Sequence, residues 1–262
     1  MMDIRRRRFL LAVLLAACTA RRLVSEEPSV QELPLSGEHL SGLEQRLEAE
    51  LVAATRRMIP GSENVSHYSR RGDALFFLAR FDEAVADYDR MVELDGTFAE
   101  THWRRGIALF YAGRFPAAAS QFEKYHSFDK IDRENGIWRY LSQYRAHGQK
   151  VARAGLLMYD KDDREPFPSV YKLFGGTMVP SQILEQIERA DISTEERQKR
   201  LFYAHLYTGL NDAVEGDALQ ARHHLRLSTL NPWALTAGYG PAYMWHVGRL
   251  HENLLRTKPD QP

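Results

Sequence analysis

The stretch YSRRGDALFFLARFDEAVADYDRMVEL, residues 68–94, returns in outline 34 positions later as HWRRGIALFYAGRFPAAASQFEKYHSF, residues 102–128. The matched positions are Gly72, Ala74, Phe81, Ala84, Tyr88 and Leu94, followed by Gly106, Ala108, Phe115, Ala118, Phe122 and Phe128. Small residues let two helices of a hairpin approach closely, and large residues fill the space between them. The stretch therefore predicts a helical hairpin that occurs twice.

The spacing of 34 residues, with this order of small and aromatic positions, is typical of the tetratricopeptide repeat. We predict an all-α tetratricopeptide solenoid over residues 39–255, with clear repeats at 65–98 and 99–132. The pattern decays in the middle of the chain, and a diverged repeat is expected at about 195–232. Stacked hairpins bury their apolar faces on their neighbours and form a concave surface that binds partners.

Two features of the later chain lead to further expectations. In the diverged repeat the first helix is predicted to be about one turn longer, from Leu210 to Glu215, and no clear glycine stands near His205. Residues 160–166, DKDDREP, form an acidic turn that lacks the ligand spacing and central glycine of a calcium loop. We expect this turn to be solvated.

The N-terminus has the features of an export signal. In residues 1–18, four arginines precede a short apolar run that ends in Leu-Ala-Ala-Cys, as in a bacterial lipobox. Lipidation is predicted at Cys18, the only cysteine; the alternative is a free or buried thiol. The run Arg6-Arg7-Arg8-Phe9-Leu10 fits a twin-arginine signal, with Arg6 and Arg7 as the pair, and equally a general secretory signal.

The segments that flank the predicted solenoid are polar. Residues 19–38 are predicted to be a flexible tether and residues 256–262 a polar tail. The sequence therefore indicates a protein of the cell envelope, lipid-anchored and facing the periplasm from the outer membrane.

Composition and motifs argue against several classes of function. Lys+Arg and Asp+Glu both total 35, and without residues 1–17 the remainder carries a charge of about −3, which does not suit nucleic acid. A single cysteine excludes a thiolate metal cluster. The sequence contains no nucleophile elbow, phosphate-binding loop, dinucleotide motif or zinc-protease helix. We predict no catalytic residues, no metal and no cofactor.

Candidate binding residues follow from the positions that line the groove in such repeats. They are aromatic and largely uncharged, as is typical of surfaces that dock apolar side chains of a protein or peptide. The residues are Phe76, Phe77, Trp103, Phe110 and Tyr111. The alternative is that a neighbouring helix of the same chain fills this groove. The arginine pairs at 70–71 and 104–105 share the period and are expected on solvated helix faces.

A leucine stripe precedes the repeats, formed by Leu40, Leu43, Leu47 and Leu51 at helical spacing. The helix that carries it is predicted to extend to about Met58. It either caps the end of the solenoid or mediates dimerisation.

The lipobox, tether, leading helix, two repeats, decayed middle and diverged final repeat together resemble the NlpI-type tetratricopeptide lipoproteins. The resemblance is clearest at residues 68–95, at GIWRYL (136–141) and at FYA (202–204). It implies a homodimeric outer-membrane adaptor that brings peptidoglycan hydrolases to a carboxy-terminal processing protease. The alternative function is a structural subunit of an outer-membrane assembly complex.

Overall fold

A computed structural model of the chain describes residues 37–58 and 63–257, and every regular element in these two ranges is a helix. The all-α prediction is confirmed for this part of the chain. The predictions for the signal peptide, with Arg6, Arg7 and Cys18, lie outside the described residues, as do those for most of the tether and the tail.

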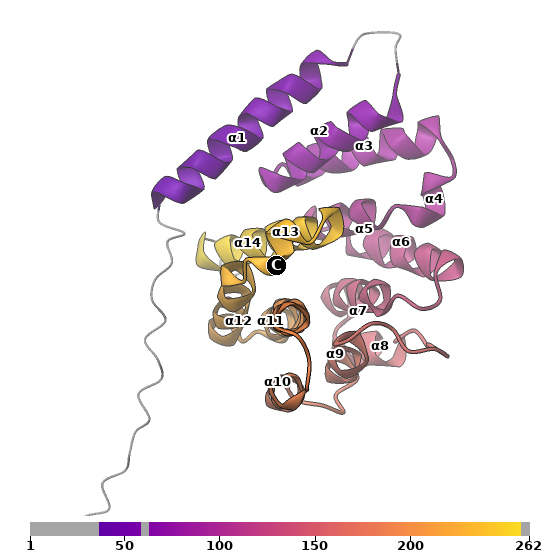
Figure 1. The fold of residues 1–262 in the computed structure, drawn as a ribbon. Coiled ribbons are helices and arrows are strands. Elements are labelled where there is room, and N and C mark those ends of the chain that lie inside the picture. Colours follow the sequence, from indigo (N-terminus) through magenta and orange to yellow (C-terminus); the bar gives the residue numbers. More distant parts are fainter. Residues whose placement is uncertain (1–36, 59–62, 258–262) are drawn as a thin grey trace, which may run out of the picture. The chain divides into compact units, whose positions relative to one another are not determined.

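The described helices, in chain order, are α1 (Gly37–Arg56), α2 (Val65–Phe77), α3 (Phe81–Leu94), α4 (Phe98–Thr101), α5 (Trp103–Tyr111), α6 (Phe115–Phe128), α7 (Arg133–His147), α8 (Gln149–Ala154), α9 (Phe167–Phe174), α10 (Pro180–Arg189), α11 (Thr194–Glu215), α12 (Ala218–Leu230), α13 (Trp233–Thr236) and α14 (Tyr239–Thr257). They pack mainly as neighbouring pairs, among them α2 with α3, α5 with α6 and α11 with α12 (Figure 1).

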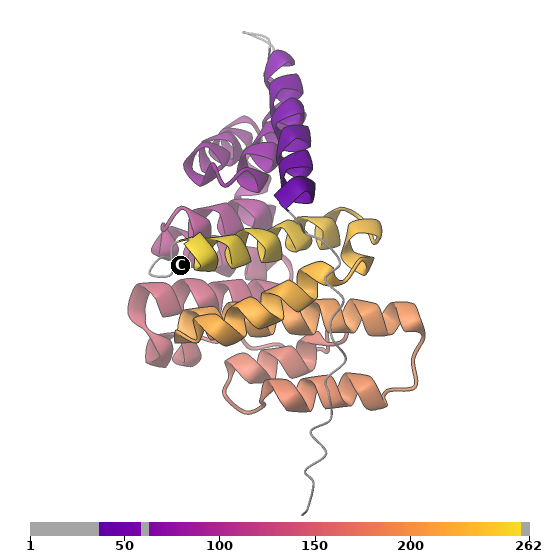
Figure 2. The same cartoon turned by 90° about the vertical axis from the view of Figure 1, so that its left-hand side faces the viewer.

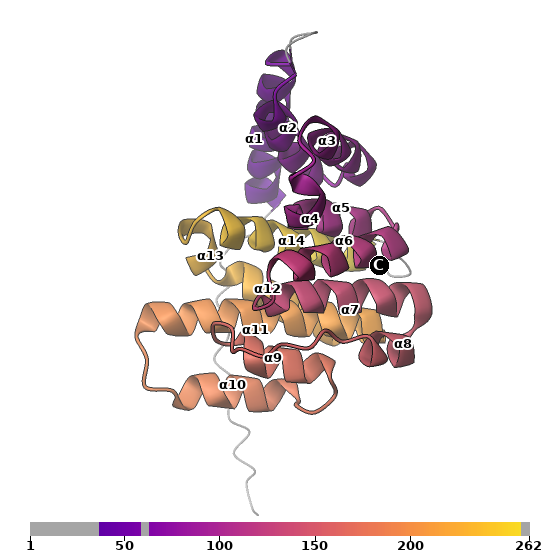
Figure 3. The ribbon, with the colours of Figure 1, turned by 90° about the vertical axis from the view of Figure 1, so that its right-hand side faces the viewer.

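Several contacts join helices that are distant in the sequence. Helix α14, drawn in yellow, runs beside α12 and also contacts α2 (Figure 2). Helix α7 packs against α6, α9 and α11 (Figure 3). The C-terminal helix therefore returns to the first hairpin, and α7 connects the early hairpins with the later ones.

The first two hairpins repeat one set of side-chain contacts at an offset of 34 residues. A Cβ atom at Gly72 would lie 2.6 Å from the Tyr88 ring, and one at Gly106 would lie 2.6 Å from the Phe122 ring. The ring pairs Phe76–Phe81 and Phe110–Phe115 both have centroids 5.5 Å apart. The sequence period therefore corresponds to a repeated packing arrangement.

The hairpin of α11 and α12 contains the same glycine contact, which corrects the expectation of a missing glycine. Gly209 faces Leu225, 16 residues later, and a Cβ on Gly209 would lie 2.7 Å from Leu225 Cγ. Sixteen residues also separate Gly72 from Tyr88. The second helix begins nine residues after the glycine in each case, at Ala218 here. The predicted extra turn after Leu210 is therefore wrong, since the additional length of α11 precedes the glycine.

The recurring arginines make ion pairs between helices, so the expectation of solvated faces is wrong for three of the four. Arg71 Nε donates to Asp87 Oδ2 at 2.8 Å, and its counterpart Arg105 donates from Nη1 to Gln121 Oε1 at 2.7 Å. Arg104 Nη1 donates to Asp73 Oδ1 at 2.6 Å. Side chains at the same repeat position thus fasten the same two helices together.

Within residues 37–58 and 63–257, no helix is both long and apolar enough to cross a bilayer. In the same ranges no group of three or more histidine, cysteine, aspartate or glutamate side chains is arranged to hold a metal ion.

Candidate binding site

The aromatic residues predicted to line the groove lie together on α2 and α5, where α14 of the same chain covers them. Tyr243 of α14 stacks on Phe76 with ring centroids 5.0 Å apart, and it meets Phe77 at 5.1 Å and Trp103 at 4.9 Å. Phe77 also stacks on His246 at 3.9 Å. Of the two alternatives left by the sequence, the structure contains the one in which a helix of the chain fills the groove.

The remaining two groove residues are also enclosed. Phe110 is 1% exposed and packs on Trp138, while Tyr111 is 8% exposed. The Tyr111 hydroxyl lies 2.9 Å from Nδ1 of His251, another residue of α14. Neither side chain offers a free surface to a partner while α14 is in place.

A polar network fixes the first turn of α14 against α2 and α5. The Tyr239 hydroxyl donates to Asp73 Oδ2 at 2.6 Å and lies 2.9 Å from Arg104 Nη1. Arg104 Nη1 also donates to Ser69 Oγ at 3.0 Å. Because Arg104 and Asp73 are both mostly buried, their mutual attraction is weakly screened. This network holds α14 in the groove.

Next to Trp103, on the side away from the covered groove residues, a cavity of about 370 Å³ remains open. Its size falls in the range of ordinary ligand sites. Most of its wall is aromatic, and one end carries charged groups. It is lined by Trp103, Ile107, Phe122, Tyr125, Asp132, Glu134, Asn135, Trp138, Arg164, Lys199, Tyr203, Trp233, Gly240, Pro241 and Met244.

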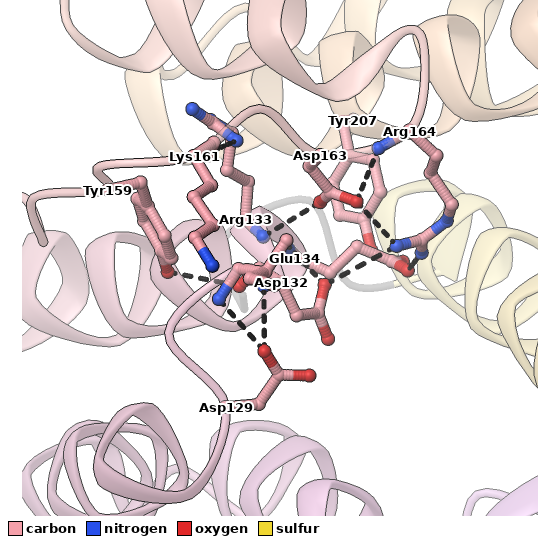
Figure 4. Close-up of polar contacts among 10 residues, drawn as sticks. Asp129, Asp132, Arg133, Glu134, Tyr159, Lys161, Asp163, Arg164 and Tyr207 are labelled. Atoms are coloured by element: carbon pink, nitrogen blue, oxygen red, sulfur yellow. Dashed lines mark hydrogen bonds and ion pairs between the residues drawn. The ribbon is translucent and has the colours of Figure 1, made fainter.

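The polar end of the cavity is built at the N-terminus of α7 (Figure 4). Asp132 is the N-cap residue, and its Oδ1 accepts a hydrogen bond from the Glu134 backbone N–H at 3.0 Å. Asp163, from the loop before α9, accepts from the Arg133 backbone N–H at 2.9 Å. Free N–H groups and the helix dipole favour carboxylates at this position. This explains why acidic residues from two segments gather here.

A single guanidinium joins these carboxylates. Arg164 makes a short ion pair with Glu134, donates to Asp163 Oδ1 at 3.1 Å and lies 3.7 Å from Asp132 Oδ1 (Figure 4). The Tyr207 hydroxyl also donates to Glu134. The expected solvated turn at residues 160–166 is therefore only partly correct, since the Asp163 side chain is 6% exposed while that of Asp162 is 91% exposed.

Both carboxyl groups that face the cavity are held near protonation. Burial, together with the neighbouring charge of Glu134, raises the pKa of Asp132 to about 7, although Arg164 opposes the shift. Burial also raises the pKa of Glu134, against the effects of Arg164 and of the Tyr207 hydrogen bond. The site therefore contains more negative charge than its one arginine balances.

Asn135, the next residue of α7, adds an unsatisfied polar group to the same cavity. Its side chain is buried, at 3% exposure, and neither Oδ1 nor Nδ2 makes a hydrogen bond of regular geometry. The neighbouring Tyr159 hydroxyl, whose pKa the amide helps to lower, donates instead to the Asp132 backbone carbonyl oxygen at 3.0 Å. A buried amide without partners is costly, and a ligand in the cavity would relieve that cost.

The raised pKa of Asp132 leads to a prediction about pH and stability. A folded chain whose acid has a higher pKa than in the unfolded chain binds more protons, so the free energy of unfolding falls as pH rises. The window runs from the ordinary value of 3.8 to about 7. In Asp132→Asn, which keeps an N-cap oxygen, this fall should be smaller. The charged groups facing Asp132 are Glu134, Asp163 and Arg164.

Urea unfolding of the wild type and of Asp132→Asn at several pH values between 4 and 7 measures this difference. The exposed carboxylate in Asp82→Asn serves as the control. Parallel stability curves for the wild type and Asp132→Asn would contradict the environment described for Asp132.

Sequence reasoning identified only Trp103 among the residues that line this cavity. Asp132, Glu134, Asn135 and Arg164 come from segments where the repeat pattern has decayed, so no repeat position marked them. Trp233, interpreted from sequence as packing only, also lines the cavity. A usable signal was the clustering of acids with arginines on both sides of residue 132 and at 160–165.

Comparison with protein-family models finds none that matches this chain, and no curated protein shows a significant match to it.

Proposed function

We propose that this chain is a non-catalytic, lipid-anchored adaptor of the tetratricopeptide type, which binds partner proteins in the bacterial cell envelope. The observation that carries the proposal is the aromatic cavity beside Trp103, set in a framework of repeated helical hairpins. Tryptophan and tyrosine are the residue types that most often dominate the energy of protein–protein contacts. The cavity replaces the wider groove as the docking surface, because α14 occupies that groove.

The tetratricopeptide assignment draws on the sequence period and on contacts that recur with it. The offset of 34 residues joins Gly72 with Gly106, and the partner rings follow at Tyr88 and Phe122. Anchoring at Cys18 is supported by the lipobox and by the position of the only cysteine after an apolar run. The resemblance to NlpI-type lipoproteins adds a carboxy-terminal processing protease and peptidoglycan hydrolases as the proposed partners.

Affinity capture from detergent-solubilised envelopes tests the proposal, with a variant that blocks the cavity. Gly240 lines the cavity, and a Cβ atom there would meet nothing within 4 Å, so Gly240→Phe should fill space without strain in the fold. Gly96→Phe, at an equally open position outside the cavity, is the matched control. We expect proteases and wall hydrolases to be captured by the wild type and by Gly96→Phe, and to be lost from Gly240→Phe.

Two results would contradict the proposal. Equal capture by Gly240→Phe would remove the cavity from partner binding. Recovery of an integral barrel protein at equal stoichiometry would favour a structural subunit of an assembly complex. Membrane fractionation of Cys18→Ala tests the anchor separately, because a variant that stays as firmly in the membrane as the wild type would refute lipidation at Cys18.

A further inference from the structure

The charge balance at the polar end of the cavity favours a cationic ligand group. Asp132, Glu134 and Asp163 surround the single guanidinium of Arg164. The other cation that lines the cavity, Lys199, is paired with Glu196 at 2.8 Å, and Arg200 shares the same carboxylate at 2.8 Å. A positive group placed near Asp132 would meet two facing carboxylates, whereas a negative group would be repelled by them.

The unsatisfied amide of Asn135 points independently to a ligand in the same place. Its Oδ1 can accept a hydrogen bond from an ammonium or guanidinium group, and its Nδ2 can donate to a peptide carbonyl. Both atoms are buried without a regular partner. An apolar ligand would leave them so, at a continuing cost in free energy.

The walls of the cavity suit the rest of a basic side chain. Trp103, Trp138 and Trp233 offer flat apolar surfaces for a methylene stem, and ring faces also attract a cation. The structure already contains this geometry nearby, where the Arg164 guanidinium lies 4.3 Å from the Phe167 ring centroid and 5.7 Å from that of Tyr203. Aromatic walls with an acidic end are therefore complementary to lysine and arginine.

We propose that the cavity receives a lysine or arginine side chain from an extended segment of a partner protein, with its cationic head near Asp132 and Asn135 and its stem along the tryptophans. This inference rests on the proposed adaptor function and specifies the chemistry of the segment that is bound. Selection comes from the polar end of the cavity, because the aromatic walls alone would accept any long apolar side chain.

Binding of synthetic peptides to the full-length chain in detergent tests the inference. The probes are acetylated and amidated pentapeptides, Ala-Leu-Xaa-Leu-Ala, in which Xaa is lysine, arginine, norleucine or glutamate. Intrinsic tryptophan fluorescence reports occupancy, since three tryptophans line the cavity. We expect the lysine and arginine peptides to bind at least about tenfold more tightly than the norleucine peptide, because only they satisfy the buried polar groups. The glutamate peptide should bind most weakly.

Two variants separate charge recognition from folding. Asp132→Asn keeps the N-cap hydrogen bond and removes the charge, so it should weaken the lysine peptide several-fold and leave the norleucine peptide unchanged. Asp82→Asn removes an exposed carboxylate that pairs with Arg114, and it should bind all probes as the wild type does. Circular dichroism of each variant confirms that the fold is retained.

The inference is overturned if norleucine or glutamate peptides bind as tightly as the lysine peptide, if Asp132→Asn keeps the full preference, or if no probe binds. These outcomes differ from a failure of the adaptor proposal, which envelope capture with Gly240→Phe decides. Loss of partners from Gly240→Phe without a preference for basic peptides would leave the adaptor function in place and remove only the basic side chain.

Discussion

Replacing Tyr243 by alanine is expected to lower the free energy of unfolding by about 4 kcal/mol, as is usual for truncating a large buried aromatic residue. Tyr243 is 1% exposed and meets Phe76, Phe77 and Trp103 at centroid distances of 4.9 to 5.1 Å. Its removal would leave a cavity at the point where α14 covers α2 and α5. For a chain of this size the melting temperature should fall by roughly 10 °C.

Tyr243→Phe is the matched control for this prediction. The Tyr243 hydroxyl is buried and makes no hydrogen bond of regular geometry, so its removal should change stability by less than about 1 kcal/mol. Denaturant unfolding of the three proteins provides the comparison. If Tyr243→Ala were as stable as the wild type, α14 would not fill the groove in solution, and the groove aromatics would again be available to a partner.

Replacing Gly209 by alanine is expected to cost about 2–3 kcal/mol, in the range of other overpacked cores. The added Cβ would lie 2.7 Å from Leu225 Cγ and 3.0 Å from two backbone atoms, Ala221 O and Leu225 N. Backbone atoms cannot move aside as the end of a side chain can, so α11 and α12 would have to separate. The gain in helix propensity from glycine to alanine, about 1 kcal/mol, offsets part of this cost.

Gly42→Ala, in the interior of α1, should have the opposite sign. The nearest heavy atom to a Cβ there is Arg46 Nη1 at 3.9 Å, so only the propensity gain of up to about 1 kcal/mol remains. Thermal unfolding of both variants against the wild type is the measurement. A neutral or stabilising Gly209→Ala would refute the close approach of α11 and α12 and its equivalence to the contacts at Gly72 and Gly106.

The sequence predicted the helical class and the first two hairpins because their packing depends on residue size at fixed spacing. Gly72 and Gly106 need a large ring opposite them, and both the glycines and the rings are visible as a period. The third hairpin was aligned incorrectly, since Leu225 occupies the place of the ring and α11 has a longer N-terminal part. A repeat that keeps the glycine and changes its partner is harder to recognise by pattern.

The cavity could not be predicted in the same way, because its parts come from segments with no shared period. Asp132 and Glu134 belong to the start of α7, whereas Arg164 comes from a loop 30 residues later. Only the fold brings them together. The position of α14 was equally hidden, since an amphipathic final helix is compatible both with capping an end and with filling the groove.

Site-specific photo-crosslinking in intact cells tests most directly the claim that partners dock in the cavity. A benzophenone amino acid in place of Lys199 would project from the cavity lining, and one in place of Leu219, which is 75% exposed on α12, serves as the control. We predict crosslinks to envelope proteins from position 199 that disappear when Gly240→Phe is added, and few from position 219. Crosslinks of equal strength from position 219, or none from position 199, would contradict partner docking in this cavity.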